Sequence, residues 1–148
     1  MSIINRIDQD IKEALKAGEK DKLTVLRGLK SDFKYKQIEL GKELTDELAM
    51  EVLSSAAKKR RESIGQYKSG NRDDLVRKEQ AELAIIEQYL PQQLSEDELR
   101  EIVQAAVEET GAESMKQMGQ VMQAVMPKVK GRADGKLVNK LVSEILAN

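Results

Sequence analysis

Basic residues and glycines gather near the end of the chain, in the segment PKVKGRADGK at positions 127–136. Asp134 suits the cap of a final helix, because its carboxylate can accept a hydrogen bond from an amide of the first turn. The start of a helix also offers unpaired N–H groups and the positive end of the helix dipole. Cations beside such a start predict an anion site with phosphate as its natural ligand, and an ordinary solvated loop is the alternative. The cations are Lys128, Lys130, Arg132 and Lys136.

Gly131, Pro127 and Gly119 add expectations about the backbone around this segment. Gly131 can adopt a positive φ or permit a close approach to the main chain, and Pro127 predicts a bend or the end of the preceding helix. Glycine inside a helix costs about 1 kcal/mol relative to alanine. Gly119 therefore predicts close contact between the last two helices, which would present the basic loop at the end of the pair.

A second basic run, KKRR at positions 58–61, lies within a predicted helix whose apolar face passes close to Arg60. Arg60 is therefore expected to face inward, while the residues around it project outward. Those neighbours form a candidate auxiliary phosphate-binding stripe, and a solvated helix surface is the default interpretation. The stripe consists of Lys58, Lys59 and Arg61.

Four methionines share one face of the sixth expected helix, at spacings of three and four residues. Thioether groups can bind Cu(I) or form an adaptable groove for a partner helix. Flexible apolar side chains on one face more often fill a core, and we favour that interpretation while the partner groove stays open. The residues are Met115, Met118, Met122 and Met126.

The chain contains no Cys and no His, which removes several kinds of chemistry. It has no disulfide, no thiolate, no proton shuttle for neutral pH and none of the commonest metal ligands. Adjacent acids such as Asp73 and Asp74 point apart on a helix, and no base accompanies them. We therefore expect a protein without catalytic residues, metal or cofactor.

Charged residues make up 34% of the chain and aromatic residues 3%, so a core must come from Leu, Ile, Val, Ala and Met. This composition favours helices over sheet, and apolar residues recur at spacings of three and four along the chain. We predict an all-α fold of seven helices. The expected N-caps are Thr45, Asn71, Ser95, Ser114 and Asp134, and the expected helix stops are Gly18, Gly41 and Gly111.

The sequence LPQQLSEDEL marks the best boundary between two lobes, because Pro91 removes a backbone donor and disfavours helical geometry at the residue before it. Residues 1–92 are predicted to form an amino-terminal lobe of helical hairpins, and residues 93–148 a small three-helix lobe. Charge is uneven in the second lobe. Residues 93–113 hold seven acidic groups and one basic group, whereas residues 114–148 hold six basic and two acidic groups.

The opening residues MSIINRIDQD carry charge where a signal peptide needs a continuous apolar stretch. No window approaches the roughly 18 apolar residues that a membrane-spanning helix needs. We therefore expect a cytoplasmic protein with no membrane partner. The heptad-like spacing in the third expected helix is too short to predict a coiled coil or an oligomeric state.

The end of the chain also carries a family signature. The segment MGQVMQAVMPKVKGRADGKLVNKLVSEIL resembles the carboxy-terminal signature of the GatB/YqeY family, M-G-x-V-M-x-x-V-M-P-x-x-K-G-x-A-D-G-x-x-V-N. The segments YLPQQLSEDELREIV and RIDQDIKEALKAGEKDKLTVLRGLKSD extend the resemblance to the free-standing YqeY-like proteins. Together these segments bring essentially the whole chain into the comparison.

The resemblance implies an all-helical protein with an amino-terminal helical lobe and a three-helix carboxy-terminal lobe. In this family, GatB proteins are subunits of the glutamine-dependent amidotransferase that acts on misacylated Glu-tRNA or Asp-tRNA, and the equivalent helical tail contacts the tRNA elbow. It therefore implies tRNA as a partner, with an amidotransferase or another translation protein as a second. The implied RNA-binding residues are Lys128, Lys130, Gly131, Arg132, Gly135, Lys136, Asn139 and Lys140.

Catalysis does not carry over, because the catalytic cradle of GatB and its metal ligands have no counterpart in this sequence. The hypothesis is a non-catalytic protein that recognises the shape of a folded tRNA through phosphates and 2′-hydroxyls. Residues 93–148 contain no Phe, Tyr or Trp, which argues against single-strand binding. Two alternatives stay open: a helical adaptor that docks a partner through the sixth-helix methionines or the long third helix, and an accessory subunit of an amidotransferase, a carbon–nitrogen ligase.

Overall fold

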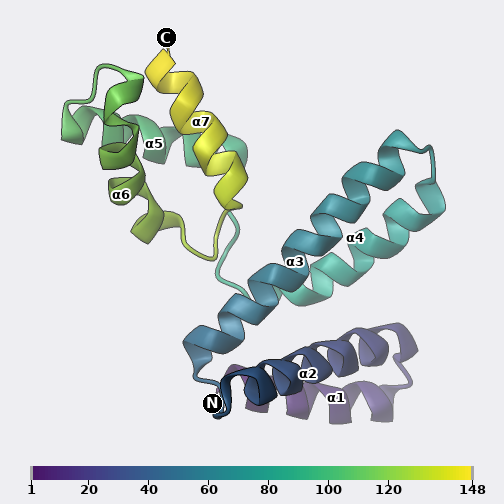
Figure 1. The fold of residues 1–148 in the computed structure, drawn as a ribbon. Helices are drawn as coiled ribbons and strands as arrows, with labels where there is room; N and C mark the ends of the chain where they lie inside the picture. Colours follow the sequence, from purple (N-terminus) through teal and green to yellow (C-terminus); the bar gives the residue numbers. More distant parts are fainter. Residues whose placement is uncertain (1, 148) are drawn as a thin grey trace. The chain divides into compact units, whose positions relative to one another are not determined.

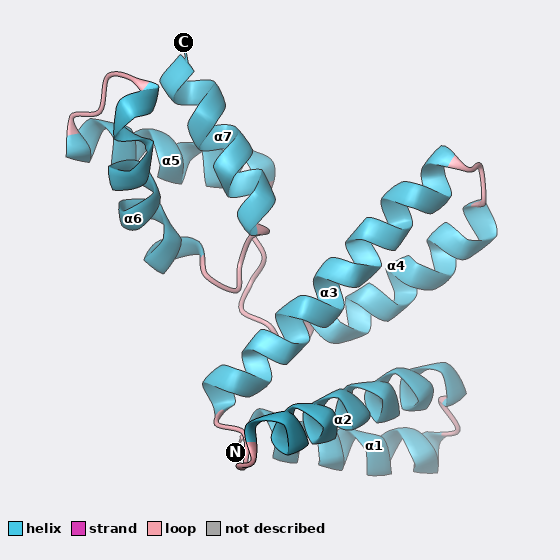
Figure 2. Cartoon of the chain, viewed as in Figure 1, coloured by secondary structure: helices cyan, strands magenta, loops and turns pink. Residues whose placement is uncertain are grey.

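The computed structural model describes residues 2–147, and every regular element in that range is helical (Figure 2). This confirms the predicted all-α fold. The chain divides into two compact units, one up to Leu90 and one from Pro91 onward, and each is described by itself. The helices in Figure 1 are α1 (Ile3–Ala17), α2 (Lys20–Leu40), α3 (Asp46–Ser69), α4 (Asp73–Glu87), α5 (Glu96–Thr110), the 3-10 helix η1 (Met115–Gln117), α6 (Met118–Val129) and α7 (Gly135–Ala147).

Two helical hairpins build the first unit, with α1 beside α2 and α3 beside α4 (Figure 1). Each helix contributes apolar residues at spacings of three or four to one shared core. Burying one such side chain stabilises the fold by about 1.5–3 kcal/mol. The large side chains of this core that are at most 2% exposed are Ile7, Leu26, Leu29, Phe33, Leu53 and Ile86.

Local signals fix most helix ends in the first unit. Thr45 Oγ1 accepts a hydrogen bond from the Leu48 N–H at 3.2 Å, so the predicted cap of α3 is confirmed. Gly18 and Gly41 follow α1 and α2 with φ angles of 73° and 69°, which confirms both as helix stops. Glycine suits these positions because it lacks the Cβ that makes a left-handed backbone unfavourable for other residues.

The predicted cap of α4 is wrong. Arg72, and not Asn71, occupies the N-cap position before Asp73. Asn71 instead has a φ of 56° and reverses the chain after α3, a left-handed conformation that Asn tolerates better than most residues. The Arg72 side chain then hydrogen-bonds to Asp74, Nη2 to Oδ2 at 3.1 Å, and this bond lowers the pKa of Asp74.

Tyr89 ties the end of the first unit to its first helix. The Tyr89 O–H donates to Asp10 Oδ2, and the Arg6 guanidinium carbon lies 5.2 Å from the centre of the Tyr89 ring. Burial raises the pKa of Tyr89, and the hydrogen bond to Asp10 raises it further. The phenol therefore stays neutral, and the buried ring holds the residues after α4 against α1.

Helices α5, α6 and α7 pack as a small bundle in the second unit (Figure 1). Ser95 Oγ accepts from the Glu98 N–H at 3.1 Å, and Gly111 follows α5 with a φ of 68°, so both predicted ends of this helix are confirmed. The bundle core is aliphatic and contains no aromatic ring among the described residues. Its fully buried residues include Leu99, Val103, Val121, Val125, Val138 and Leu141.

The sixth helix begins later than predicted, and it continues past Pro127. A 3-10 turn comes first, in which Gln117 Oε1 accepts from the Ser114 N–H at 3.3 Å, so the α-helix begins only at Met118. Pro127 does not end α6, which continues to Val129. A proline so close to a helix end removes one N–H, and few later residues depend on the turn that it disturbs.

Gly119 does not mark a close helix contact, so that prediction is wrong. The residue is exposed, and a Cβ added to it would meet nothing within 4 Å. Three methionines behave as expected for core packing, because they lie partly buried against the bundle core, whereas Met115 is exposed. The three are Met118, Met122 and Met126.

Candidate anion-binding site

The basic loop between α6 and α7 is a tight turn. Gly131 has a φ of 76°, which confirms that the backbone is left-handed at this position. The N–H groups of Arg132 and Ala133 both donate to Val129 O, at 2.8 and 3.1 Å. These two bonds hold the main chain of the loop in one conformation.

Gln93 supports this loop from the start of the second unit. Its Nε2 donates to Gly131 O at 2.9 Å and to Pro91 O at 2.9 Å. Gln93 was not predicted as part of the site. The sequence offers no signal for it, because a Gln between Pro91 and the cap Ser95 looks like any polar linker residue.

Two more bonds join the same segments. The Leu94 N–H donates to Arg132 O at 2.8 Å, and Arg132 Nε donates to Gln92 O at 3.1 Å. We call these bonds, with the one from Gln93 to Gly131, the brace. Because the brace holds both the carbonyl and the guanidinium of Arg132, it orders the loop before any ligand binds. A guanidinium carries four further N–H donors on its terminal nitrogens.

The start of α7 confirms the predicted cap and lowers its attraction for anions. Asp134 Oδ1 accepts from the Lys136 N–H at 3.1 Å, and Asp134 O accepts from the Val138 N–H at 3.1 Å. The carboxylate therefore occupies part of the positive end of the helix dipole. An anion at this site would depend on the neighbouring cations more than on the helix start itself.

The lysines around the loop are exposed and held weakly. Lys128 Nζ lies 3.6 Å from Glu109 Oε2, and Lys140 Nζ lies 3.9 Å from Glu144 Oε1. Exposed pairs of this kind contribute about 0–1 kcal/mol, so a phosphate can replace the carboxylate at little cost. Lys130 is exposed on the loop between them.

The first turns of α7 extend the basic surface beyond the loop. Gly135, Lys136, Asn139 and Lys140 are all exposed. Lys136 and Lys140 are four residues apart and therefore share a face of the helix. A Cβ at Gly135 would meet nothing within 4 Å, so the fold does not require glycine there and a ligand can come close to the main chain. Six of the eight candidate residues are thus exposed, Gly131 and Arg132 are partly buried, and Lys128 is turned toward Glu109 on α5.

The auxiliary stripe on α3 follows the prediction only in part. Arg60 faces inward as expected, because its Nη1 donates to Ala56 O at 3.3 Å. Arg61 does not project outward. Its Nη2 lies 3.2 Å from Glu87 Oε1, since α4 lies along α3 and brings that carboxylate opposite.

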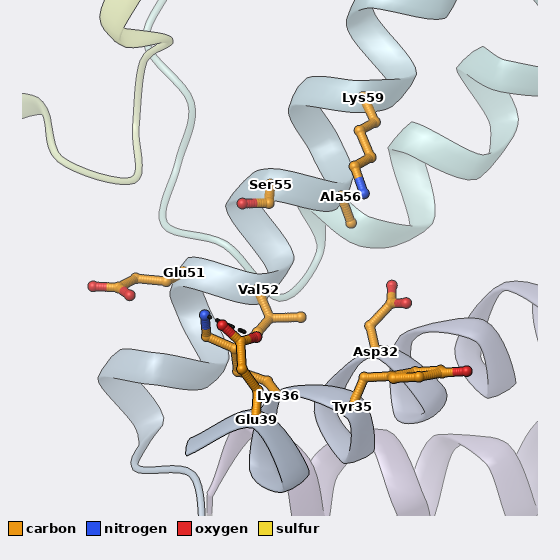
Figure 3. Close-up of a pocket in the computed structure, with 9 residues that line it drawn as sticks. All are labelled: Asp32, Tyr35, Lys36, Glu39, Glu51, Val52, Ser55, Ala56 and Lys59. Atoms are coloured by element: carbon orange, nitrogen blue, oxygen red, sulfur yellow. Dashed lines mark ion pairs between the residues drawn. The ribbon is translucent and has the colours of Figure 1, made fainter.

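The remaining lysines of the stripe lie in mixed surroundings. Lys58 is partly buried, and Lys59 lines a cavity of about 310 Å³ between α2 and α3 (Figure 3). Three carboxylates line the same cavity, those of Asp32, Glu39 and Glu51. Because these acids lower the local potential, the stripe is a poorer anion site than the basic loop.

Comparison with known proteins places this chain in a protein family. Residues 4–146 match the family described as Yqey-like protein. The chain belongs to the YqeY family. This confirms the resemblance seen in the sequence, and the matched region contains every residue of the candidate site.

This YqeY-family chain also resembles curated fungal proteins with the name altered inheritance of mitochondria protein 41, mitochondrial. The protein from Saccharomyces cerevisiae strain S288c is 34% identical over 90 residues, which cover 60% of this chain and 49% of that protein. The Eremothecium gossypii protein is 36% identical over 85 residues, which cover 57% of this chain and 46% of that protein. The Lachancea thermotolerans protein is 34% identical over 90 residues, which cover 60% of this chain and 48% of that protein. The alignments therefore span about half the length of these relatives.

Some residues of the YqeY signature have structural roles, and others are exposed at the surface. Gly131 makes the turn, Asp134 caps α7, and Met122 packs against the bundle core. Gly135 and Asn139 belong to the same signature but lie exposed on α7. The exposed members are the ones available to a ligand.

Neither a membrane-crossing helix nor a carboxylate metal centre occurs in the part of the chain that the structure describes. None of the helices between residues 2 and 147 combines the length and the apolar character that crossing a bilayer requires. Within the same range, no three acidic side chains gather closely enough to hold a metal ion.

Proposed function

We propose that this YqeY-family protein binds folded tRNA through the basic loop and the first turns of α7, without catalysing a reaction. The observation that carries the proposal is the brace, which orders a loop whose lysines stay exposed. The brace stabilises the loop in any case, and a binding loop that is already ordered also loses less entropy when its ligand arrives. The contact residues are Lys128, Lys130, Gly131, Arg132, Gly135, Lys136, Asn139 and Lys140.

The chemistry of this surface favours the backbone of a folded RNA over its bases. Lysines contact phosphates as point charges, and the exposed Asn139 amide can bond to a 2′-hydroxyl. Residues 93–148 contain no aromatic side chain on which an unpaired base could stack. We therefore propose recognition by shape, and the resemblance to the GatB tail supports the tRNA elbow as the contact.

A salt titration tests the proposal. Transfer RNA is titrated against the wild type and a variant with Ala in place of Lys128, Lys130, Arg132 and Lys136, over a series of salt concentrations. The logarithm of the wild-type affinity should fall with the logarithm of salt, at a slope of about 0.7–0.9 for each phosphate contact. The variant should bind at least tenfold more weakly, with a shallower slope.

A matched control separates site binding from net charge. A second variant carries Ala in place of four exposed lysines of the first unit, which removes the same charge. Its affinity for tRNA should stay close to that of the wild type. If the wild type and both variants bind equally weakly, tRNA binding by this loop is refuted. The control residues are Lys12, Lys16, Lys20 and Lys42.

An accessory role beside a glutamine-dependent amidotransferase is a finer form of the same proposal. It predicts that the protein co-purifies with the enzyme and that nuclease treatment weakens the association, because tRNA would bridge the two. The cytoplasm is our proposed compartment for this chain, while the name of the fungal relatives assigns those proteins to mitochondria. A methionine groove for a partner is not proposed, since three of the four methionines pack against their own core.

A further inference from the structure

Helix α2 carries two large apolar side chains outside the core, of which Tyr35 also lines the cavity beside α3 (Figure 3). Tyr35 and Ile38 are 76% and 74% exposed. They continue a series at alternating spacings of four and three residues, which is the spacing of a helix that packs lengthwise against another helix. We call this exposed series the outer stripe. It consists of Thr24, Gly28, Ser31, Tyr35 and Ile38.

The first half of the outer stripe contains small residues that the fold itself does not require. A Cβ at Gly28 would meet nothing within 4 Å, although glycine in the middle of a helix is less favourable than alanine. Thr24 and Ser31 are exposed on either side of it. Small side chains let a second helix approach closely, and Tyr35 and Ile38 then supply the apolar contact area.

Opposite charges line the two edges of the outer stripe. Arg27 and Lys34 lie on one edge, each directly before a stripe residue. Asp32 and Glu39 lie on the other edge, each directly after one, and both line the cavity beside α3 (Figure 3). Glu39 Oε2 lies 3.6 Å from Lys36 Nζ, an exposed pair that exchanges readily with another cation.

We propose that the outer stripe binds a second copy of this chain, with the two α2 helices parallel. In a parallel pair, a residue on one edge faces the residue five positions later on the opposite edge of the other helix. Arg27 then faces Asp32 of the second copy, and Lys34 faces Glu39 of the second copy. An antiparallel pair would instead bring the two acidic edges together and the two basic edges together. Charge complementarity therefore selects the parallel arrangement.

The contact is short, so the dimer is weak. The outer stripe covers about two heptads, and its buried area falls below the roughly 1,200–2,000 Å² of a stable complex. We expect association at a Kd on the order of 100 µM. The dimer does not depend on tRNA binding, because the outer stripe belongs to the first unit and the basic loop to the second.

Sedimentation velocity tests for the dimer. The average mass of the wild type should rise from 16.6 kDa toward twice that value as its concentration is raised from about 10 µM to about 1 mM. A variant with Tyr35→Asp and Ile38→Asp should remain a monomer with unchanged helix content, since both side chains are exposed. Leu15→Asp is the matched control, because Leu15 is 59% exposed on α1, outside the stripe. A wild type that stays monomeric at about 1 mM overturns the proposal.

Single cysteines test the orientation, because the chain has no Cys of its own. Thr24→Cys and Ser31→Cys should each form an intermolecular disulfide under mild oxidation, since equal stripe positions face each other only in a parallel pair. Ser69→Cys, at the exposed end of α3, should not. An antiparallel pair can bring at most one of the two stripe positions against its own copy. A disulfide at one position alone therefore refutes the parallel arrangement.

Charge reversal provides an independent check of the register. Lys34→Glu should weaken the dimer at least fivefold, because it places two acids opposite each other on both sides of the pair. Adding Glu39→Lys should restore the wild-type affinity. If Lys34→Glu alone strengthens association, the basic edges face each other and the proposed register is wrong.

Discussion

Replacing Gln93 by alanine removes one side chain that contacts the basic loop without changing any charge. Gln93 Nε2 donates to Gly131 O and Pro91 O, each at 2.9 Å, and both bonds are partly buried. An intramolecular hydrogen bond contributes about 0.5–1.5 kcal/mol net. Two such bonds give an expected loss of about 1–3 kcal/mol in the stability of the loop relative to an open state.

Amide hydrogen exchange of the full chain measures this loss at the residues concerned. The Leu94 N–H, which donates to Arg132 O at 2.8 Å, should exchange about 5–150 times faster in the Gln93→Ala variant. Affinity for tRNA should fall as well, because a loosened loop must be ordered on binding. The salt dependence of binding should stay the same, since the number of cations is unchanged.

Gln92→Ala is the matched control for this variant. The side chain of Gln92 is exposed, and its bond to Arg132 Nε uses the main-chain carbonyl, which alanine retains. Gln92→Ala should therefore match the wild type in exchange and in tRNA affinity. If the Gln93 and Gln92 variants behave alike, the side chain of Gln93 does not order the loop and the reasoning from the brace fails.

Three further predictions concern charge, pH and packing. Asp134→Asn keeps a capping oxygen but removes a negative charge, so tRNA should bind about twofold to tenfold more tightly in a titration at low salt. The folded state raises the pKa of Tyr89 above its unfolded value, so the contribution of the phenol to stability should be complete below about pH 10 and be lost as the pH rises further. Denaturation of the wild type and of Tyr89→Phe at several pH values measures this loss. Leu141→Ala should lower the unfolding free energy by about 2–5 kcal/mol in urea, because Leu141 is fully buried.

Much of the fold follows from local sequence signals. Thr45, Ser95 and Asp134 were predicted as caps and were found as caps, because each bonds to an amide only two or three residues away. Asn71 was misassigned because a left-handed turn and a helix cap favour the same residue type. The close helix contact predicted at Gly119 is absent, because the sequence does not tell whether another helix lies beside a given glycine.

The sequence indicates the cations of the candidate site but not the residues that hold the loop in place. Lys128, Lys130 and Arg132 stand out in the sequence because they are close together. Their partners come from distant segments, such as Glu109 on α5 and Gln93 near the start of the second unit. These hydrogen bonds join residues that are 38 or 40 positions apart in the sequence. Such distant pairs leave no periodic pattern in the sequence, so only the folded chain reveals them.

The brace also decides where the second unit can be cut. A fragment that begins at Ser95 would keep α5, α6 and α7 and the whole aliphatic core, and it would pass the usual checks of helix content and melting behaviour. It would nevertheless lack residues 91–94, whose bonds to Gly131 and Arg132 shape the basic loop. Such a fragment is expected to fold and yet to bind tRNA poorly. A fragment of the second unit made for binding experiments should therefore begin at Pro91 or earlier.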